Sequence, residues 1–167
     1  MNAVNFGGLN MEIHEIVKNA FVAAVYVVLT LVVAPHLSYG EVQFRISEAL
    51  LILVLFNKKY WLGLLVGTFL ANLGSPLGII DWVVGTSASA LSIYFMLQLK
   101  NKLALCLLVP AIINGLFVGI ELYYVFQVPL LAGFVSVFFG EFVVVFILGG
   151  ILYKTLEHNE GFLKVIR

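Results

Sequence analysis

The chain has 167 residues, of which 62% are hydrophobic and only 11% are charged, and its mean hydropathy is +1.10. A soluble domain of this length needs a charged surface, which so few ionisable residues cannot provide. Nine lysines and arginines balance nine acids, which excludes a basic surface for nucleic acid. The composition therefore predicts an integral membrane protein with most of its residues inside a lipid bilayer.

Apolar runs divide the chain into segments. Four of them approach or exceed the roughly 20 residues that a spanning helix requires: residues 17–34, 81–99, 102–124 and 129–153. Two shorter runs, 46–56 and 60–73, are separated by Asn57-Lys58-Lys59, and adjacent lysines argue against a tip buried in the membrane. We therefore expect an all-α fold with six transmembrane helices.

The six helices define three parts of the chain. The membrane domain is expected over residues 17–153, followed by a cytoplasmic tail over residues 154–167. The polar segment 1–16 lacks the basic start and the cleavage site of a signal peptide, so it is expected to remain as a cytoplasmic N-terminal segment.

Cations are distributed unevenly about these helices. Eight of the nine fall on the side of both termini: Lys18, Lys58, Lys59, Lys100, Lys102, Lys154, Lys164 and Arg167. The positive-inside rule makes this side cytoplasmic and leaves Arg45 alone on the outer side. Aromatic residues, Tyr26 among them, fall mostly near the span ends, as interfacial aromatics do. The short loops contain no nucleotide-binding loop, so energy for any transport must come from a partner or an ion gradient.

Few ionisable or strongly polar residues lie at membrane depth, and most of them map to the outer half: Arg45, Glu48, Asn72, Asp81, Asn114, Glu121 and Glu141. Asn114 and Glu121 are seven residues apart and therefore share one helix face. Glu141 lies near the midplane, where a carboxylate needs a partner or a proton. The pattern predicts a binding pocket that is open to the outside and closed toward the cytoplasm.

Some of these residues also have a purely structural interpretation. Arg45 and Glu48 are three residues apart at a helix start, so a simple interfacial ion pair stays open beside a ligand role. Asp81 follows Gly78 where another helix begins, and helix capping by its carboxylate is the favoured interpretation. The Glu121 side chain could merely reach the outer interface.

Small residues at helical spacing indicate close packing. The third helix has a flat stripe made by Gly63, Gly67 and Ala71. The first helix has a similar patch made by Ala20, Ala23 and Ala24. The patch either packs within the chain or docks another membrane protein, and the sequence leaves both alternatives open.

Residues of the kind that enzymes use do not form a recognisable set. The three histidines fall on different sides of the membrane, and the single cysteine, Cys106, lies in an apolar run. We therefore expect no disulfide, no metal site, no cofactor and no enzymatic activity.

Three blocks of sequence together resemble the QueT family: Val42-Gln43-Phe44-Arg45-Ile46-Ser47-Glu48-Ala49-Leu50, Ala71-Asn72, and Gly78-Ile79-Ile80-Asp81-Trp82-Val83-Val84-Gly85-Thr86. This family comprises substrate-binding S-components of energy-coupling factor (ECF) transporters. The resemblance implies capture of a queuosine precursor, a 7-deazaguanine base, from outside the cell. It also implies that the patch around Ala20, Ala23 and Ala24 docks on a transmembrane coupling subunit, which binds two cytoplasmic ATPases.

A deazaguanine ligand gives the polar residues definite roles. Its pairing edge presents adjacent N–H donors that one carboxylate can accept together, and its flat ring suits aromatic stacking. The expected contacts are Glu121 or Glu141 at the base edge, Asn72 and Asn114 as amide partners, Glu48 or Asp81 for a cationic substituent, Arg45 to orient Glu48, and Trp82 for stacking. Three alternatives remain open: an S-component for another vitamin-type solute, a stand-alone proton-coupled carrier that uses Glu141, and a non-transporting assembly protein.

Overall fold

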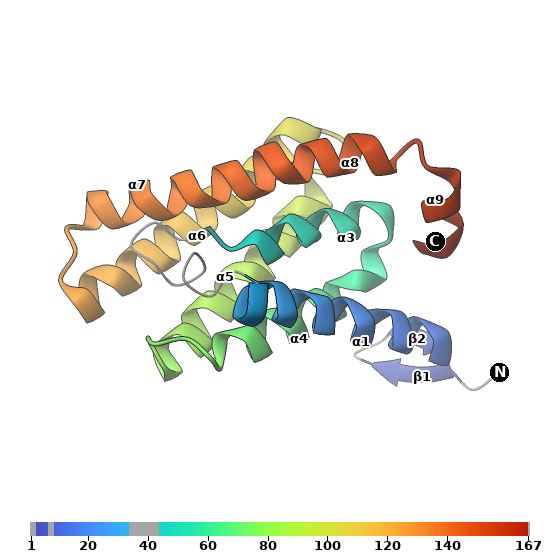
Figure 1. The fold of residues 1–167 in the computed structure, drawn as a ribbon, viewed down its shortest axis with the longest axis horizontal. Coiled ribbons are helices and arrows are strands. Elements are labelled where there is room, and N and C mark those ends of the chain that lie inside the picture. Colours follow the sequence, from blue (N-terminus) through green and yellow to red (C-terminus); the bar gives the residue numbers. More distant parts are fainter. Residues whose placement is uncertain (1–2, 7–8, 34–43, 167) are drawn as a thin grey trace.

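The structure is a computed structural model that describes residues 3–6, 9–33 and 44–166. The outer loop predicted to follow the first helix, with His36 and the beginning of the Val42 block, lies outside the described residues. Figure 1 shows a bundle of helices of unequal length, with the longest axis of the molecule horizontal.

Among the described residues, four helices are long and apolar enough to cross a membrane. The first joins α1 (Ile13–Val28) to the π-helix η1 (Leu29–Val33). The next two are α5 (Ile79–Gln98) and α6 (Leu103–Phe126). The fourth joins α7 (Leu130–Glu141), the π-helix η4 (Phe142–Gly149) and α8 (Gly150–Leu156). At 1.5 Å per residue, helices of this length extend about 30–40 Å, so these four predicted spans are confirmed by length and composition.

Two further helical segments are shorter. The 3-10 helix η2 (Ile46–Ile52) continues into α3 (Leu53–Phe56), and the 3-10 turn η3 (Lys58–Tyr60) leads into α4 (Trp61–Asn72). The two segments meet at the predicted Asn57-Lys58-Lys59 turn. With their 3-10 turns included, the two segments reach only about 20–24 Å, against a hydrocarbon core of about 30 Å. The number of six transmembrane helices therefore stays a prediction.

The N-terminal segment forms strands, which the expectation of an all-α chain omitted. β1 (Ala3–Phe6) pairs antiparallel with β2 (Leu9–Glu12), and Phe6 lies opposite Leu9. The sequence contains a signal for this hairpin, because Gly7-Gly8 separates two short segments in which apolar and polar residues alternate. The first helix also begins at Ile13, four residues before the predicted start of the membrane domain.

The hairpin and the short C-terminal helix α9 (Glu160–Ile166) lie at the same end of the molecule (Figure 1). Polar contacts join this end to the helices. Lys59 forms an ion pair with Glu15, and Lys18 donates a hydrogen bond to the carbonyl of Val165. The predicted tail is therefore partly helical and is held against α1.

The helices pack in pairs around a large hydrophobic core, and a smaller cluster lies between α6 and α7. α7 and η4 run along α6, and α1 lies beside α4, with η2 and α3 between these two layers (Figure 1). Fully buried side chains from four elements meet in the core: Leu51 and Ile52 of η2, Leu64 of α4, Met96 of α5 and Val145 of η4. This packing holds η2, with its buried polar residues Ser47 and Glu48, at the centre of the bundle.

The predicted stripe of small residues on α4 packs against α1 within the chain. A Cβ atom added at Gly67 would lie 2.9 Å from the Cβ of Tyr26 and 3.1 Å from the Cα of Ala23. At Gly63 it would lie 2.9 Å from the Cα of Asn19. Glycine therefore lets the two helix backbones approach closely.

Replacing Gly67 by leucine is expected to lower the free energy of unfolding by about 1–3 kcal/mol, because the larger side chain overpacks the α1–α4 contact. Thermal unfolding of the purified protein in detergent measures the change. Val66→Leu is the matched control, since Val66 is the preceding residue and is 43% exposed. Equal stability of the Gly67 variant and the wild type would contradict the packing described.

Candidate functional site

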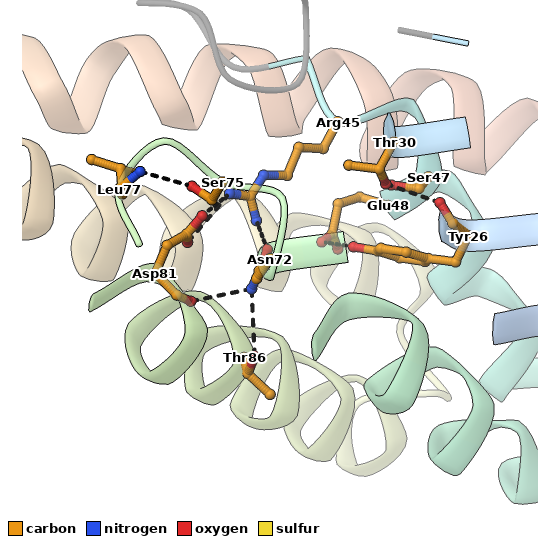
Figure 2. A network of polar contacts seen from close by, with 10 residues as sticks. All are labelled: Tyr26, Thr30, Arg45, Ser47, Glu48, Asn72, Ser75, Leu77, Asp81 and Thr86. Carbon is orange, nitrogen blue, oxygen red and sulfur yellow. Dashed lines mark hydrogen bonds and ion pairs between the residues drawn. The ribbon is translucent and has the colours of Figure 1, made fainter. Parts of the chain in front are cut away.

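Arg45 lies at the centre of a buried polar network. Its side chain is 5% exposed and forms an ion pair with Asp81, with Nη2 3.0 Å from Oδ2. Nη1 donates a hydrogen bond of 3.2 Å to Oδ1 of Asn72. Figure 2 shows the guanidinium directed at these two residues. The spacing in sequence had left an ion pair between Arg45 and Glu48 open, whereas the structure places the carboxylate of Asp81 3.0 Å from Nη2 of Arg45.

Asn72 supports this ion pair from the other side. Its amide nitrogen donates to the backbone carbonyl of Asp81 at 3.2 Å and to Oγ1 of Thr86 at 3.4 Å (Figure 2). Gly85 makes room for the arrangement, because an added Cβ would lie 2.7 Å from Nδ2 of Asn72 and would overlap Oδ1 of Asp81. The amide group of Asn72 is thus already bonded at both its oxygen and its nitrogen.

Asp81 lies in the first turn of α5, as expected, but does not cap the helix. The N-cap residue is Gly78, at φ 64°, and no side-chain cap hydrogen bond is formed there. The carboxylate of Asp81 is fully buried and points to Arg45. The capping interpretation is therefore wrong, and the reason is that a buried guanidinium provides a stronger partner than the helix end.

A second set of polar contacts joins α1 to η2. The hydroxyl of Tyr26 donates to Oε1 of Glu48, and both residues are almost completely buried. Thr30 donates to the carbonyl of Tyr26 at 2.9 Å and lies 2.7 Å from the hydroxyl of Ser47. Tyr26, predicted to be an interfacial aromatic, is instead buried in the bundle, and Thr30 and Ser47 were not among the predicted site residues. Two polar side chains four residues apart in an apolar helix lie on one helix face, and this spacing of Tyr26 and Thr30 is the sequence pattern that could have indicated a buried polar contact.

The remaining predicted residues come from α6 and α7. Glu141 is the last residue of α7, where the helix widens into the π-helix η4, and it is 2% exposed. The side chain of Asn114 on α6 is within hydrogen-bonding reach of it, and Glu48 and Arg45 are close enough to interact electrostatically with it. Glu121, also on α6, is 2% exposed. The interpretation in which Glu121 reaches the outer interface is therefore wrong.

Several buried acceptor atoms have no hydrogen-bond partner in the part of the chain that the structure describes: Oε2 of Glu48, both carboxylate oxygens of Glu121, and Oε2 of Glu141. The indole Nε1 of Trp82 is likewise without a partner there. A buried polar atom that lacks a partner is destabilising by about 1–3 kcal/mol, so such atoms are rare unless something else satisfies them. The hydroxyls of Ser89 and Ser92 on α5 also lack a partner among the described residues, so the four carboxylate oxygens are the acceptors that remain for donors from outside the chain.

Acidic side chains outnumber basic ones in this network. Among the described residues, the buried carboxyl groups of Glu48, Asp81, Glu121 and Glu141 accompany a single buried guanidinium, that of Arg45. The field of Arg45 reaches Asp81, Glu48 and Glu141, and that of Asp81 reaches Glu121. The chemistry that this centre lacks is therefore N–H donors and positive charge.

The small-residue patch on α1 has two different faces. Ala20 and Ala24 are exposed and lie on a stripe with Val17, Phe21 and Val28. Ala23 is 6% exposed and packs against Gly67 of α4. The structure therefore removes Ala23 from the predicted docking surface, because its side chain already packs inside the chain.

Helices of spanning length around a buried polar centre define a multi-pass membrane protein. The profile of the QueT transporter family matches residues 16–158. The chain therefore belongs to the QueT transporter family, which places its function in membrane transport rather than in enzymatic catalysis.

A curated relative supports the same family. It is the queuosine precursor transporter QueT of Lactococcus lactis subsp. cremoris (strain MG1363), which is 30% identical over 148 residues. The similar region spans 80% of this chain and 87% of the relative. No solved structure matches the chain.

Replacing Asp81 by asparagine is expected to lower the free energy of unfolding by about 3–5 kcal/mol, because it leaves a buried guanidinium without its charged partner. Thermal unfolding in detergent measures this loss. The matched control is Glu157→Gln, which removes an exposed contact to His158 at 3.7 Å and is expected to change stability by less than about 0.5 kcal/mol. Similar stabilities for the two variants would show that the buried ion pair does not hold the centre together.

Proposed function

We propose that the chain is the substrate-capturing subunit of an ATP-driven importer of the ECF type and that it binds a queuosine precursor from outside the cell. The family and the name of the relative point to this substrate class. The observation that carries the proposal is the set of buried carboxylate oxygens without hydrogen-bond donors. A 7-deazaguanine base supplies several N–H donors, and its aminomethyl form also supplies a positive charge.

The base edge is assigned to Glu121, with Glu141 as the alternative. Both carboxylate oxygens of Glu121 lack a hydrogen-bond donor among the described residues. This one carboxylate can therefore accept two adjacent N–H groups of a base, in the bidentate way that side chains bind base edges. Glu141 has one open oxygen and Asn114 beside it. Asn114 is the amide partner of the ligand, whereas Asn72, engaged by Arg45 and Asp81, acts by holding the centre in shape.

The remaining groups complete the pocket. Trp82 stacks on the base and presents its indole N–H as a donor. Glu48 receives a cationic substituent in preference to Asp81, because the carboxylate of Asp81 is occupied by Arg45. The bound base then satisfies buried atoms that the protein leaves without partners.

Energy comes from partner proteins in this account. The chain contains no nucleotide-binding loop. Its six segments are transmembrane helices, and both termini are cytoplasmic, in line with the lysines on that side. The exposed stripe with Ala20 and Ala24 docks on the transmembrane coupling subunit, whose two cytoplasmic ATPases hydrolyse ATP while the loaded subunit topples in the membrane.

One observation favours a second candidate. A deeply buried carboxylate such as Glu141 is also what a proton-coupled carrier needs. The purified chain alone in vesicles would then take up substrate when a pH gradient is applied. If the chain is the binding subunit of an importer, the purified chain alone takes up no substrate, and uptake begins only when the coupling subunit, the ATPases and ATP are added.

Replacing Glu121 by glutamine is expected to weaken binding of 7-deazaguanine roughly 10–100-fold, because the variant loses a charge-assisted contact to two N–H groups. Isothermal titration of the detergent-purified protein measures the affinity. Glu160→Gln on α9 removes the same charge at an exposed position and is the control. Unchanged affinity in the Glu121 variant would assign the base edge to another residue, and no binding by the wild type would refute the substrate class.

Replacing Ala24 by tryptophan is expected to abolish ATP-driven uptake while leaving the affinity for the base unchanged, because the bulky ring blocks close approach of a partner helix. Uptake is measured in vesicles that contain the complete transporter, and affinity by titration of the single chain. Val135→Trp introduces the same ring at another exposed position, on α7, and is the control. Full uptake with Ala24→Trp would exclude this stripe as the docking surface.

A further inference from the structure

The two carboxylate oxygens of Glu48 have different environments. Oε1 accepts the hydrogen bond from the hydroxyl of Tyr26 (Figure 2). Oε2 is buried and has no hydrogen-bond partner in the part of the chain that the structure describes. A ligand that reaches Glu48 therefore meets one available oxygen, in a position that Tyr26 determines.

Tyr26 is itself held firmly. The close approach of Gly67 leaves no space beside its Cβ, where an added Cβ would be only 2.9 Å away. Thr30 bonds both the carbonyl of Tyr26 and the hydroxyl of Ser47, the residue before Glu48. The contacts of Tyr26 with Glu48 and of Thr30 with Ser47 thus connect the first helix, α1 and η1, with consecutive residues of η2. The phenol hydroxyl therefore has a fixed place relative to the backbone of Glu48.

The charge distribution indicates what the open oxygen receives. The carboxylate of Asp81 is occupied by Arg45, whereas the donors beside Glu48 are neutral hydroxyls: that of Tyr26 on Oε1, and that of Ser89 from α5, which lies close to the carboxylate. A neutral phenol satisfies one acceptor of the carboxylate without cancelling its charge. Glu48 therefore directs a carboxylate oxygen that a cationic group can use, since a charge-assisted contact favours the ionised form of the acid.

We propose that Tyr26 is a positioning residue that orients Glu48 so that its Oε2 accepts the ammonium group of an aminomethyl-substituted 7-deazaguanine. The assignment rests on the proposed function, since it presupposes a deazaguanine in this site. Tyr26 itself does not touch the ligand in this account. It acts through Glu48 and thereby sets the preference for a cationic over a neutral substituent.

The test compares two probes, 7-deazaguanine and 7-aminomethyl-7-deazaguanine, by titration of the detergent-purified protein. The wild type is expected to bind the aminomethyl probe more tightly. In Tyr26→Phe the ratio of the two affinities is expected to fall roughly three- to tenfold, because Oε1 loses its donor and the carboxylate is free to rotate. Tyr60→Phe removes a hydroxyl from another buried tyrosine, in the η3 turn, and is expected to leave the ratio unchanged.

A double-mutant comparison shows whether Tyr26 acts through Glu48. Glu48→Gln is expected to lower the same ratio, and adding Tyr26→Phe to Glu48→Gln is expected to change it no further. This comparison also serves if Tyr26→Phe alone does not fold, since the double variant has no carboxylate at position 48 that the loss of the Tyr26 hydroxyl could leave without its donor.

Other outcomes have distinct meanings. An equal loss of affinity for both probes in Tyr26→Phe, or a further fall of the ratio in the double variant, would overturn the positioning role. Wild-type protein that binds both probes equally would overturn it too, while leaving the proposed capture of deazaguanines intact. Wild-type protein that binds neither probe would refute the proposed function and this inference together.

Discussion

The buried ion pair between Arg45 and Asp81 joins two segments that are 36 residues apart in sequence and sets the geometry of the polar centre. Moving a guanidinium out of water is strongly unfavourable, so the helices around it must bring a carboxylate and further acceptors to the same place. Asn72 and Gly85 follow from this requirement, because one holds both partners by hydrogen bonds and the other leaves space for them. The start of η2 is thereby fixed against α4 and α5.

Once Arg45 and Asp81 are paired with each other, the other acids have different roles. Glu48 is half satisfied by Tyr26, Glu141 has Asn114 beside it, and Glu121 has no hydrogen-bond donor among the described residues. The protein thus combines a self-satisfied ion pair, which gives rigidity, with acceptors that are left for a ligand. Such a centre favours a ligand rich in N–H donors, and this preference is independent of the family to which the chain belongs.

The sequence allowed the long helices and the membership of the polar centre to be predicted, because hydropathy and intramembrane charge are local properties. It did not allow the pairing to be predicted. A pair of Arg45 with Glu48, three residues apart, requires both residues to lie in regular helix. Arg45 is instead the N-cap residue of η2, at φ −79° and ψ 86°, and lies outside the regular turn. Its side chain is therefore free to reach Asp81. The burial of Tyr26 and Ala23 depends in the same way on tertiary packing against α4, which no pattern within α1 reveals.

The central claim is that the substrate satisfies buried carboxylate oxygens with its own N–H groups. The most direct measurement varies the ligand and leaves the protein unchanged: titration of the wild type with 7-deazaguanine and with 7-deazahypoxanthine, which lacks the exocyclic amino group. Removal of this donor is expected to weaken binding at least about tenfold, because a buried acceptor loses its partner. Equal affinities for the two bases would contradict it.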